Sequence, residues 1–206
     1  MDIGEFKQLP ILGILRGVEQ EALEPLVEAM VSSGLKAVEI TMNTEDAAGL
    51  IKDMVGHAEG RLTVGAGTVL TEDELNQALD AGATFIVSPT LVDGVAKGCS
   101  ERNIPFFPGA LTPQEIYRAH QAGAAMVKVF PVKFFGPDYL KEIKGPFKDI
   151  ELLACGGVSP KTIKEYFDSG ASAVAFGGSI FKKELLKEKK FIEIEKQIKQ
   201  LIQARD

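Results

Sequence analysis

The 206-residue sequence has no tryptophan, only two cysteines, and fewer basic than acidic residues. Cys99 and Cys155 are too few for a disulfide-rich scaffold and match no zinc-binding spacing, so we interpret both as reduced thiols. The net charge of −6 disfavours nucleic acid or an anionic membrane as a partner, because both attract basic surfaces. A small anionic ligand stays compatible with this charge, because one local site can oppose the global sign.

Long hydrophobic runs are also missing. No stretch approaches the length of a membrane span, and the N-terminal apolar run lacks the basic flank and cleavage site of a signal peptide. We therefore expect a cytoplasmic protein. No GxGxxG follows the first expected strand, which removes the main support for a dinucleotide-binding fold.

A recurring pattern organises the chain. A small residue and a glycine precede an apolar run four times, each time after a stretch with helical spacing, in segments 33–40, 81–88, 122–129 and 169–176. Glycine suits the left-handed C-cap of a helix, and a short apolar run is typical of a buried parallel strand.

Four further apolar runs lie between these segments, at 10–15, 62–67, 104–109 and 150–157. Eight strands, each followed by a helix, favour an α/β fold of the (β/α)8 TIM-barrel type over a doubly wound sheet of five or six strands. We predict a single barrel domain over residues 1–206. The Lys/Glu-rich tail from residue 182 is expected to form one or two amphipathic helices.

Lys128 is the sharpest candidate for chemistry, because catalytic groups of such barrels gather at the C-terminal ends of the strands. Strand alternation places Val127 and Val129 towards the outer helices and turns Lys128 into the barrel. Desolvation favours the neutral amine, which is the nucleophilic form. The alternative is a structural lysine that snorkels from a strand end or pairs with an acid.

Glu39 follows the same alternation, with Val38 and Ile40 on the opposite face of its strand. A carboxyl group inside the same barrel can act as a general acid and base for imine chemistry. The alternative is a structural Glu–Lys ion pair, which is costly to bury.

Glycine pairs end the last two expected strands, Gly156-Gly157 and Gly177-Gly178, the second followed by Ser179. We expect helices to begin there, and backbone N–H groups at helix starts bind anions such as phosphate. Ser179 then either donates a hydrogen bond to the anion or caps the helix.

Thr68 and Arg16 end two other expected strands. Thr68 can contact a substrate carboxylate, cap the helix after it, or fill space in the barrel. Arg16 can bind a carboxylate or phosphate through bidentate hydrogen bonds, or form a structural salt bridge across the barrel mouth.

Six motifs together resemble the KDPG/KHG aldolases, a family of 2-keto-3-deoxy-6-phosphogluconate and 4-hydroxy-2-oxoglutarate aldolases. They occur in order as VEITMNT (38–44), VGAGTVL (64–70), IVSPTL (86–91), VKVFP (127–131), CGGVSP (155–160) and FGGS (176–179). The combination of VGAGT, KxFP and GGV is specific, although no single motif is.

The resemblance implies a class I aldolase that cleaves a 2-keto-3-deoxy sugar acid phosphate, or a related 4-hydroxy-2-oxo acid, to pyruvate and an aldehyde. It implies a cytoplasmic homotrimer that needs no metal and no cofactor. Roles carry over by motif to Lys128 (Schiff base), Glu39 (acid and base), Thr68 (carboxylate), Pro89 and Phe130 (pocket walls), and Gly156, Gly157, Gly178 and Ser179 (phosphate).

Two positions depart from the family pattern. Many gluconate-type members have an arginine at the position of Asn43, so that charged contact is either lost or passed to Arg16. Cys155 stands where several relatives have threonine. Asn43, with ILRG on the first strand, is similar to the 6-phosphogalactonate branch, so the configuration of the sugar stays open.

Two other functions use the same barrel. A phosphate-binding isomerase or synthase would use Glu39 as a base and Lys128 only as an electrostatic group. A non-catalytic sugar-phosphate sensor would bind the same ligand, but it has no need of a buried amine beside an acid.

Overall fold

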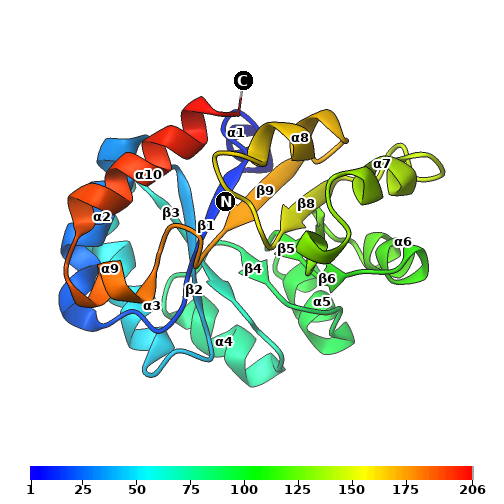
Figure 1. Ribbon diagram of the computed structural model, residues 1–206. Helices are drawn as coiled ribbons and strands as arrows, with labels where there is room; N and C mark the ends of the chain where they lie inside the picture. The colour runs from blue at the N-terminus through cyan, green and yellow to red at the C-terminus, as the bar shows by residue number, and fades with distance from the viewer. Residues whose placement is uncertain (206) are drawn as a thin grey trace.

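The computed structural model describes residues 1–205 as a barrel of parallel strands surrounded by helices (Figure 1). Nine strand segments pair in the order β5-β4-β3-β2-β1-β9-β8-β7-β6. Their bounds are Ile11–Leu15 (β1), Ala37–Thr41 (β2), Thr63–Gly67 (β3), Ile86–Val87 (β4), Phe106–Phe107 (β5), Gly109–Ala110 (β6), Val127–Val129 (β7), Leu152–Cys155 (β8) and Ala173–Phe176 (β9). Every pairing is parallel, which confirms the predicted barrel class.

The fifth predicted strand is split into β5 and β6 at Pro108, which accounts for nine segments in an eight-stranded barrel. Proline has no N–H for a strand ladder. Its carbonyl still accepts a hydrogen bond from the backbone N–H of Lys128 at 2.9 Å. Because β5 pairs with β4 and β6 pairs with β7, the two halves of this one strand close the barrel.

Helices follow the strands around the outside. Their bounds are Ile3–Phe6 (α1), Leu23–Ser33 (α2), Ala47–Ala58 (α3), Glu72–Asp80 (α4), Asp93–Glu101 (α5), Pro113–Gln121 (α6), Asp138–Lys144 (α7), Ile163–Asp168 (α8), Lys183–Lys187 (α9) and Phe191–Gln203 (α10), with short 3₁₀ turns at Gln20–Ala22 (η1) and Val132–Phe134 (η2). The glycines predicted as left-handed caps have φ between 85° and 97°, at Gly34, Gly82, Gly123 and Gly170. Gly34 is the C-cap of α2, and each of the other three directly follows the C-cap residue, so the predicted left-handed glycines at the helix ends are confirmed.

Strand alternation divides the apolar side chains into two cores. Val38, Ile40, Val127 and Val129 belong to the large core between the strands and the helices. A smaller core fills the barrel interior with Leu12, Ala37, Phe85, Val87, Phe107, Met126, Leu153, Cys155, Ala173 and Ala175. The inward face of each strand is the one that the sequence alternation predicts.

Helix α1 contributes a residue to the barrel interior, which the sequence pattern did not predict. Asp2 caps this helix by accepting a hydrogen bond from the Glu5 backbone N–H at 2.7 Å. Phe6 is buried, and its ring meets Phe107 edge to face with 6.1 Å between the ring centroids. The N-terminal segment therefore completes the packing of the interior.

The predicted tail forms two helices, α9 and α10, and its last residue, Asp206, lies outside the described residues. Ile194, Ile198 and Leu201 on α10 are fully buried in the outer core. Helix α10 lies beside α2, so segments from opposite ends of the chain pack together (Figure 1).

Replacing Phe6 with alanine tests the contribution of α1 to the interior. We expect Phe6→Ala to lower the free energy of unfolding by about 3–5 kcal/mol, as truncation of a buried phenylalanine does. Urea unfolding at neutral pH measures this change. The matched control is Phe134→Ala, because Phe134 is 73% exposed. Equal losses in both variants would show that α1 does not complete the core.

Candidate active site

Lys128 and Glu39 lie in the barrel interior, as the alternation predicts. Lys128 stands on β7 and is 6% exposed, while Glu39 stands on β2 and is fully buried. Their neighbours along each strand pack outward into the other core. Two ionisable side chains from strands far apart in the sequence thus share one largely apolar interior.

The Glu39 carboxyl group has no hydrogen-bond partner among the described residues for either of its oxygens. No ion pair within residues 1–205 joins it to Lys128. The alternative of a structural Glu–Lys ion pair therefore does not describe this geometry. Burial raises the pKa of Glu39, and the charges of Lys128 and Arg16 only partly oppose that rise.

Gly67 on β3 makes room for this carboxyl group, a role that sequence reasoning missed. A Cβ atom on Gly67 would lie 2.2 Å from Oε1 of Glu39. The neighbouring Gly65 similarly leaves space for the ring of Phe85, which a Cβ atom would approach to 2.5 Å. Of the two glycines in the VGAG motif, Gly67 therefore makes room for the acid and Gly65 for the Phe85 ring.

Phe130 lies near Lys128, and the backbone of Pro89 lies against the strand that pairs with β7. Nζ of Lys128 lies 5.3 Å from the centroid of the Phe130 ring, which is partly exposed. Lys128 pairs in register with Gly109, and a Cβ atom there would lie 2.0 Å from the Pro89 carbonyl oxygen. The end of β4 therefore reaches the strand beside the lysine.

Thr68 and Arg16 meet at the barrel mouth, where the Arg16 guanidinium donates a hydrogen bond to Thr68 Oγ1 at 3.4 Å. Thr71, rather than Thr68, caps α4, so the capping alternative for Thr68 is wrong. No ion pair among residues 1–205 involves Arg16, so the salt-bridge alternative is absent there too.

The backbone of Thr68 is left-handed, with φ at 57°, which is unusual for a β-branched residue and typical of functional sites. The fully buried Ser88 donates a hydrogen bond to the Val69 carbonyl at 2.6 Å. The Val69 N–H donates to the Val87 carbonyl at 3.2 Å. These two bonds hold the turn that presents the Thr68 hydroxyl.

Thr44 connects the loop that carries Arg16 to the loop after β2. Its hydroxyl accepts a hydrogen bond from the Gly17 N–H at 3.1 Å and lies 3.1 Å from the hydroxyl of the buried Thr41. Because Gly17 directly follows Arg16, this bond restrains the loop from which the guanidinium extends. Apart from the position of Thr44 at the end of the VEITMNT motif, the sequence contains no signal for this hydrogen bond.

The glycine pairs form turns, and the expectation that helices begin at them is wrong. Gly156 and Gly157 are left-handed, with φ of 103° and 79°, and α8 begins only at Ile163. After β9, Gly178 lies in a turn, and α9 begins at Lys183. At the first pair, the left-handed glycines redirect the chain into a turn before a helix can start.

Ser179 joins the two glycine turns instead of capping a helix. Its hydroxyl donates a hydrogen bond to the Val158 carbonyl at 2.8 Å. The two predicted phosphate loops are therefore neighbours at the barrel mouth.

Cys155 lies in the interior with Lys128 and Glu39, and both cysteines are free and buried. Burial raises the pKa of the Cys155 thiol, and the charge of Lys128 opposes that rise. The thiol therefore acts in this site as a small apolar group. Among residues 1–205, no cluster of three or more His, Cys, Asp or Glu side chains is arranged to hold a metal ion.

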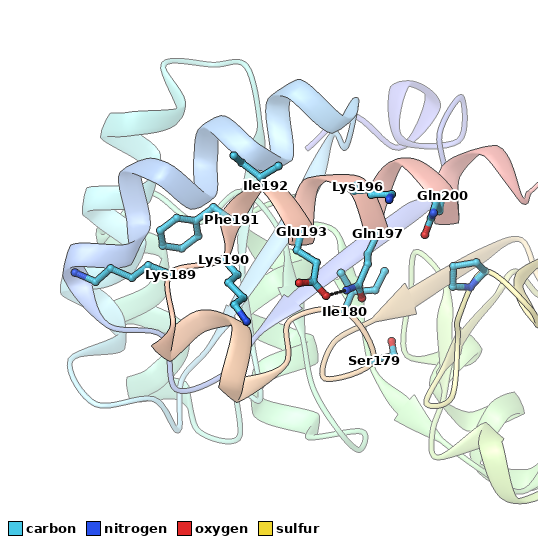
Figure 2. Close-up of a pocket in the computed structure, with 11 residues that line it drawn as sticks. Ser179, Ile180, Lys189, Lys190, Phe191, Ile192, Glu193, Lys196, Gln197 and Gln200 are labelled. Atoms are coloured by element: carbon cyan, nitrogen blue, oxygen red, sulfur yellow. Dashed lines mark hydrogen bonds between the residues drawn. The ribbon is translucent and has the colours of Figure 1, made fainter.

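A broad groove of about 820 Å³ lies outside the barrel, along α10. Figure 2 shows that Ser179 reaches its edge, while its wall consists of side chains of α10 such as Glu193 and Gln197. Neither Lys128 nor Glu39 lines this groove. No helix in residues 1–205 combines the length and the apolar character that crossing a membrane requires.

A (β/α)8 barrel with an amine and a carboxyl group buried at its centre has the architecture of an aldolase, a carbon–carbon lyase. The sequence profile of KDPG and KHG aldolase matches residues 3–197. The chain therefore belongs to the KDPG and KHG aldolase family, which confirms the resemblance seen in its motifs.

Individual relatives agree with this assignment. The chain is 33% identical to a probable 2-dehydro-3-deoxy-6-phosphogalactonate aldolase of Rhizobium meliloti, over 84% of this chain and 82% of the relative. It is 30% identical to a 2-dehydro-3-deoxy-phosphogluconate aldolase of Haemophilus influenzae, over 97% and 94%. A crystal structure of Legionella pneumophila KDPG aldolase, with pyruvate captured as a covalent carbinolamine intermediate, has a TM-score of 0.89 at 25% identity, over 97% of both chains.

The raised pKa of Glu39 predicts a pH-dependent cost in stability. Below the unfolded pKa, near 4.5, the carboxyl group is protonated in both states and its contribution to stability is fully present. As the pH rises, the unfolded state loses this proton first, so the contribution is lost as the pH passes through the folded pKa. We expect the unfolding free energy of the wild type, relative to Glu39→Gln, to fall from pH 4 to pH 8. Urea unfolding across this range measures it, and a pH-independent difference would contradict the assignment.

Thr44→Val tests whether the loop bond positions Arg16. Loss of one hydrogen bond worth about 1 kcal/mol should raise the KM for an anionic substrate several-fold and leave kcat nearly unchanged. Steady-state kinetics measures both parameters. The matched control is Thr63→Val, because Thr63 begins β3 at the end of the barrel away from the mouth. If KM is the same in both variants, Thr44 does not position the arginine.

Proposed function

We propose that this protein is a class I aldolase that cleaves 2-keto-3-deoxy-6-phosphogluconate, or its galactonate isomer, to pyruvate and glyceraldehyde 3-phosphate through a Schiff base on Lys128. The observation that carries the proposal is the burial of Lys128 in one interior with a carboxyl group, Glu39, that has no hydrogen-bond partner among residues 1–205. A carboxyl group whose pKa is raised by burial exchanges its proton closer to neutral pH than an exposed carboxyl group does, which suits a general acid and base.

The first half of the reaction forms the imine. The neutral amine of Lys128 attacks the C2 carbonyl of the keto acid and gives a carbinolamine. Glu39 donates a proton to the C2 hydroxyl group, directly or through water, so that it leaves as water. The nitrogen lone pair then forms the C=N bond of a cationic iminium.

The second half breaks the C3–C4 bond. Glu39, now a carboxylate, takes the proton of the C4 hydroxyl group, and the C4–O bond becomes a carbonyl as the aldehyde leaves. The electrons of the broken bond pass to C3 and the iminium, which becomes an enamine. Protonation of C3 and addition of water to the C=N bond release pyruvate and restore Lys128.

The remaining mouth residues are assigned to the two ends of the substrate. Thr68 and Arg16 lie together and bind the carboxylate end. Arg16 thereby supplies the charged contact that the uncharged Asn43 cannot make. Backbone groups of Gly156, Gly157 and Gly178, with Ser179, face the phosphate end, and Phe130 and Pro89 form the walls. Remote contacts of this kind orient the reacting carbons.

The quaternary and cellular setting belong to the same proposal. We propose that residues 1–206 act as one barrel domain, assembled as a homotrimer in the cytoplasm. An isomerase or a sugar-phosphate sensor on the same barrel is less well supported, because neither uses a buried amine as a nucleophile.

Trapping with pyruvate and borohydride tests the Schiff base directly. Reduction should add the mass of one reduced pyruvate to Lys128, and peptide mass spectrometry locates it. Lys128→Ala should lose both the label and essentially all retro-aldol turnover, while Glu39→Gln should lower kcat by about 10²- to 10⁴-fold.

The matched control for this test is Lys133→Ala, which removes an exposed lysine from the loop after β7. It should keep the label. Absence of label on wild-type Lys128, under conditions that label a known class I aldolase, would exclude the Schiff base and favour the isomerase or the sensor.

A further inference from the structure

A second pocket lies beside the barrel mouth, between the loop after β1 and the turn after β9. Its volume is about 340 Å³, and its lining includes Arg16, Gly178, Lys182, Lys183 and Glu184. The pocket thus shares Arg16 with the mouth of the barrel and shares the glycine turn after β9 with the proposed phosphate end. None of the family motifs in the sequence extends to the two lysines.

The charge of this pocket is positive, although the protein as a whole carries −6. Three cationic side chains line it, against the single carboxylate of Glu184. Neither Lys182 nor Lys183 forms an ion pair within residues 1–205, whereas the nearby Lys190 pairs with Glu188 at 2.7 Å. These two ammonium groups are therefore available to an anion.

The proposed substrate needs such groups, because its phosphate carries about two negative charges at neutral pH. Arg16 contacts Thr68 at the carboxylate end, and Lys128 must be neutral to attack. The turn at Gly157 has the exposed Lys133 packed against it, whereas the glycine turn after β9 offers N–H groups but no formal charge of its own. Helices α8 and α9 have only six and five residues and begin beyond these turns, so their dipoles supply little positive potential.

We propose that Lys182 and Lys183 form a cationic subsite that binds the phosphate terminus of the aldol substrate. The two lysines then determine the preference of this aldolase for phosphorylated over unphosphorylated 2-oxo acids. The inference rests on the proposed function, since it assigns the same substrate a second point of attachment. Flexible lysines suit this role, because a phosphate needs point charges more than fixed geometry.

Kinetics of Lys182→Gln, Lys183→Gln and the double variant test the subsite. For the phosphorylated gluconate and galactonate substrates, we expect KM to rise about tenfold in the double variant, with kcat nearly unchanged. For 4-hydroxy-2-oxoglutarate, which has no phosphate, KM should stay at the wild-type value. Increasing salt should raise the KM of the wild type more steeply than that of the double variant.

Lys187→Gln is the matched control, because it removes the same charge from α9 at an exposed position that does not line the pocket. It should behave as the wild type with both substrate classes. If the variants of Lys182, Lys183 and Lys187 all change the KM for phosphorylated substrates equally, the lysines act only through the general surface charge. That result would overturn the subsite. So would a wild type with the same KM for phosphorylated and unphosphorylated substrates.

Binding of inorganic phosphate separates this inference from the proposed function. Calorimetric titration should show phosphate binding to the wild type and to Lys187→Gln, and at least tenfold weaker binding to the double variant. Unchanged affinity in the double variant would overturn the subsite. Borohydride trapping of pyruvate on Lys128 should proceed equally in all these variants, so its failure would count against the aldolase and not against the lysines.

Discussion

Burial of the Glu39 carboxyl group beside Lys128 is the constraint on which the rest of this structure depends. An ionisable group without a hydrogen-bond partner is expensive to bury, and the described residues offer none to either carboxylate oxygen. The group avoids part of that cost by favouring its protonated form, as its raised pKa shows. The same shift makes the group useful as a proton donor, so the stability cost and the chemistry have one cause.

The residues around Glu39 and Lys128 leave room for these two side chains and fill the rest of the barrel interior. Gly67 leaves the volume that the carboxyl group occupies, and Pro108 interrupts one strand without opening the barrel. Phe6 and Phe107 fill the interior with aromatic carbon. An apolar interior of low dielectric strengthens electrostatic interactions between the groups placed in it.

Short hydroxyl side chains recur at the barrel mouth, each bonded to the backbone of a neighbouring loop. Thr44 accepts from Gly17, while Ser88 and Ser179 donate to the carbonyls of Val69 and Val158. Each bond joins loops that are distant in the sequence. The strand ends are thereby fixed relative to one another, which is what a site assembled from several loops requires.

The sequence by itself determined the barrel, the inward faces of its strands, the left-handed glycines after its helices, and the pairing of Lys128 with Glu39 in one interior. These features follow from local periodicity and glycine chemistry, which a short window of sequence contains. The motifs also determined the aldolase family.

Only the tertiary structure decided the rest. It showed that Phe6 packs inside the barrel, that Gly67 faces Glu39, that the glycine pairs form turns rather than helix starts, and that Lys182 and Lys183 share a pocket with Arg16. Each of these depends on contacts between segments far apart along the chain. Such contacts arise only when the barrel closes and brings the ends of all its strands to a single mouth.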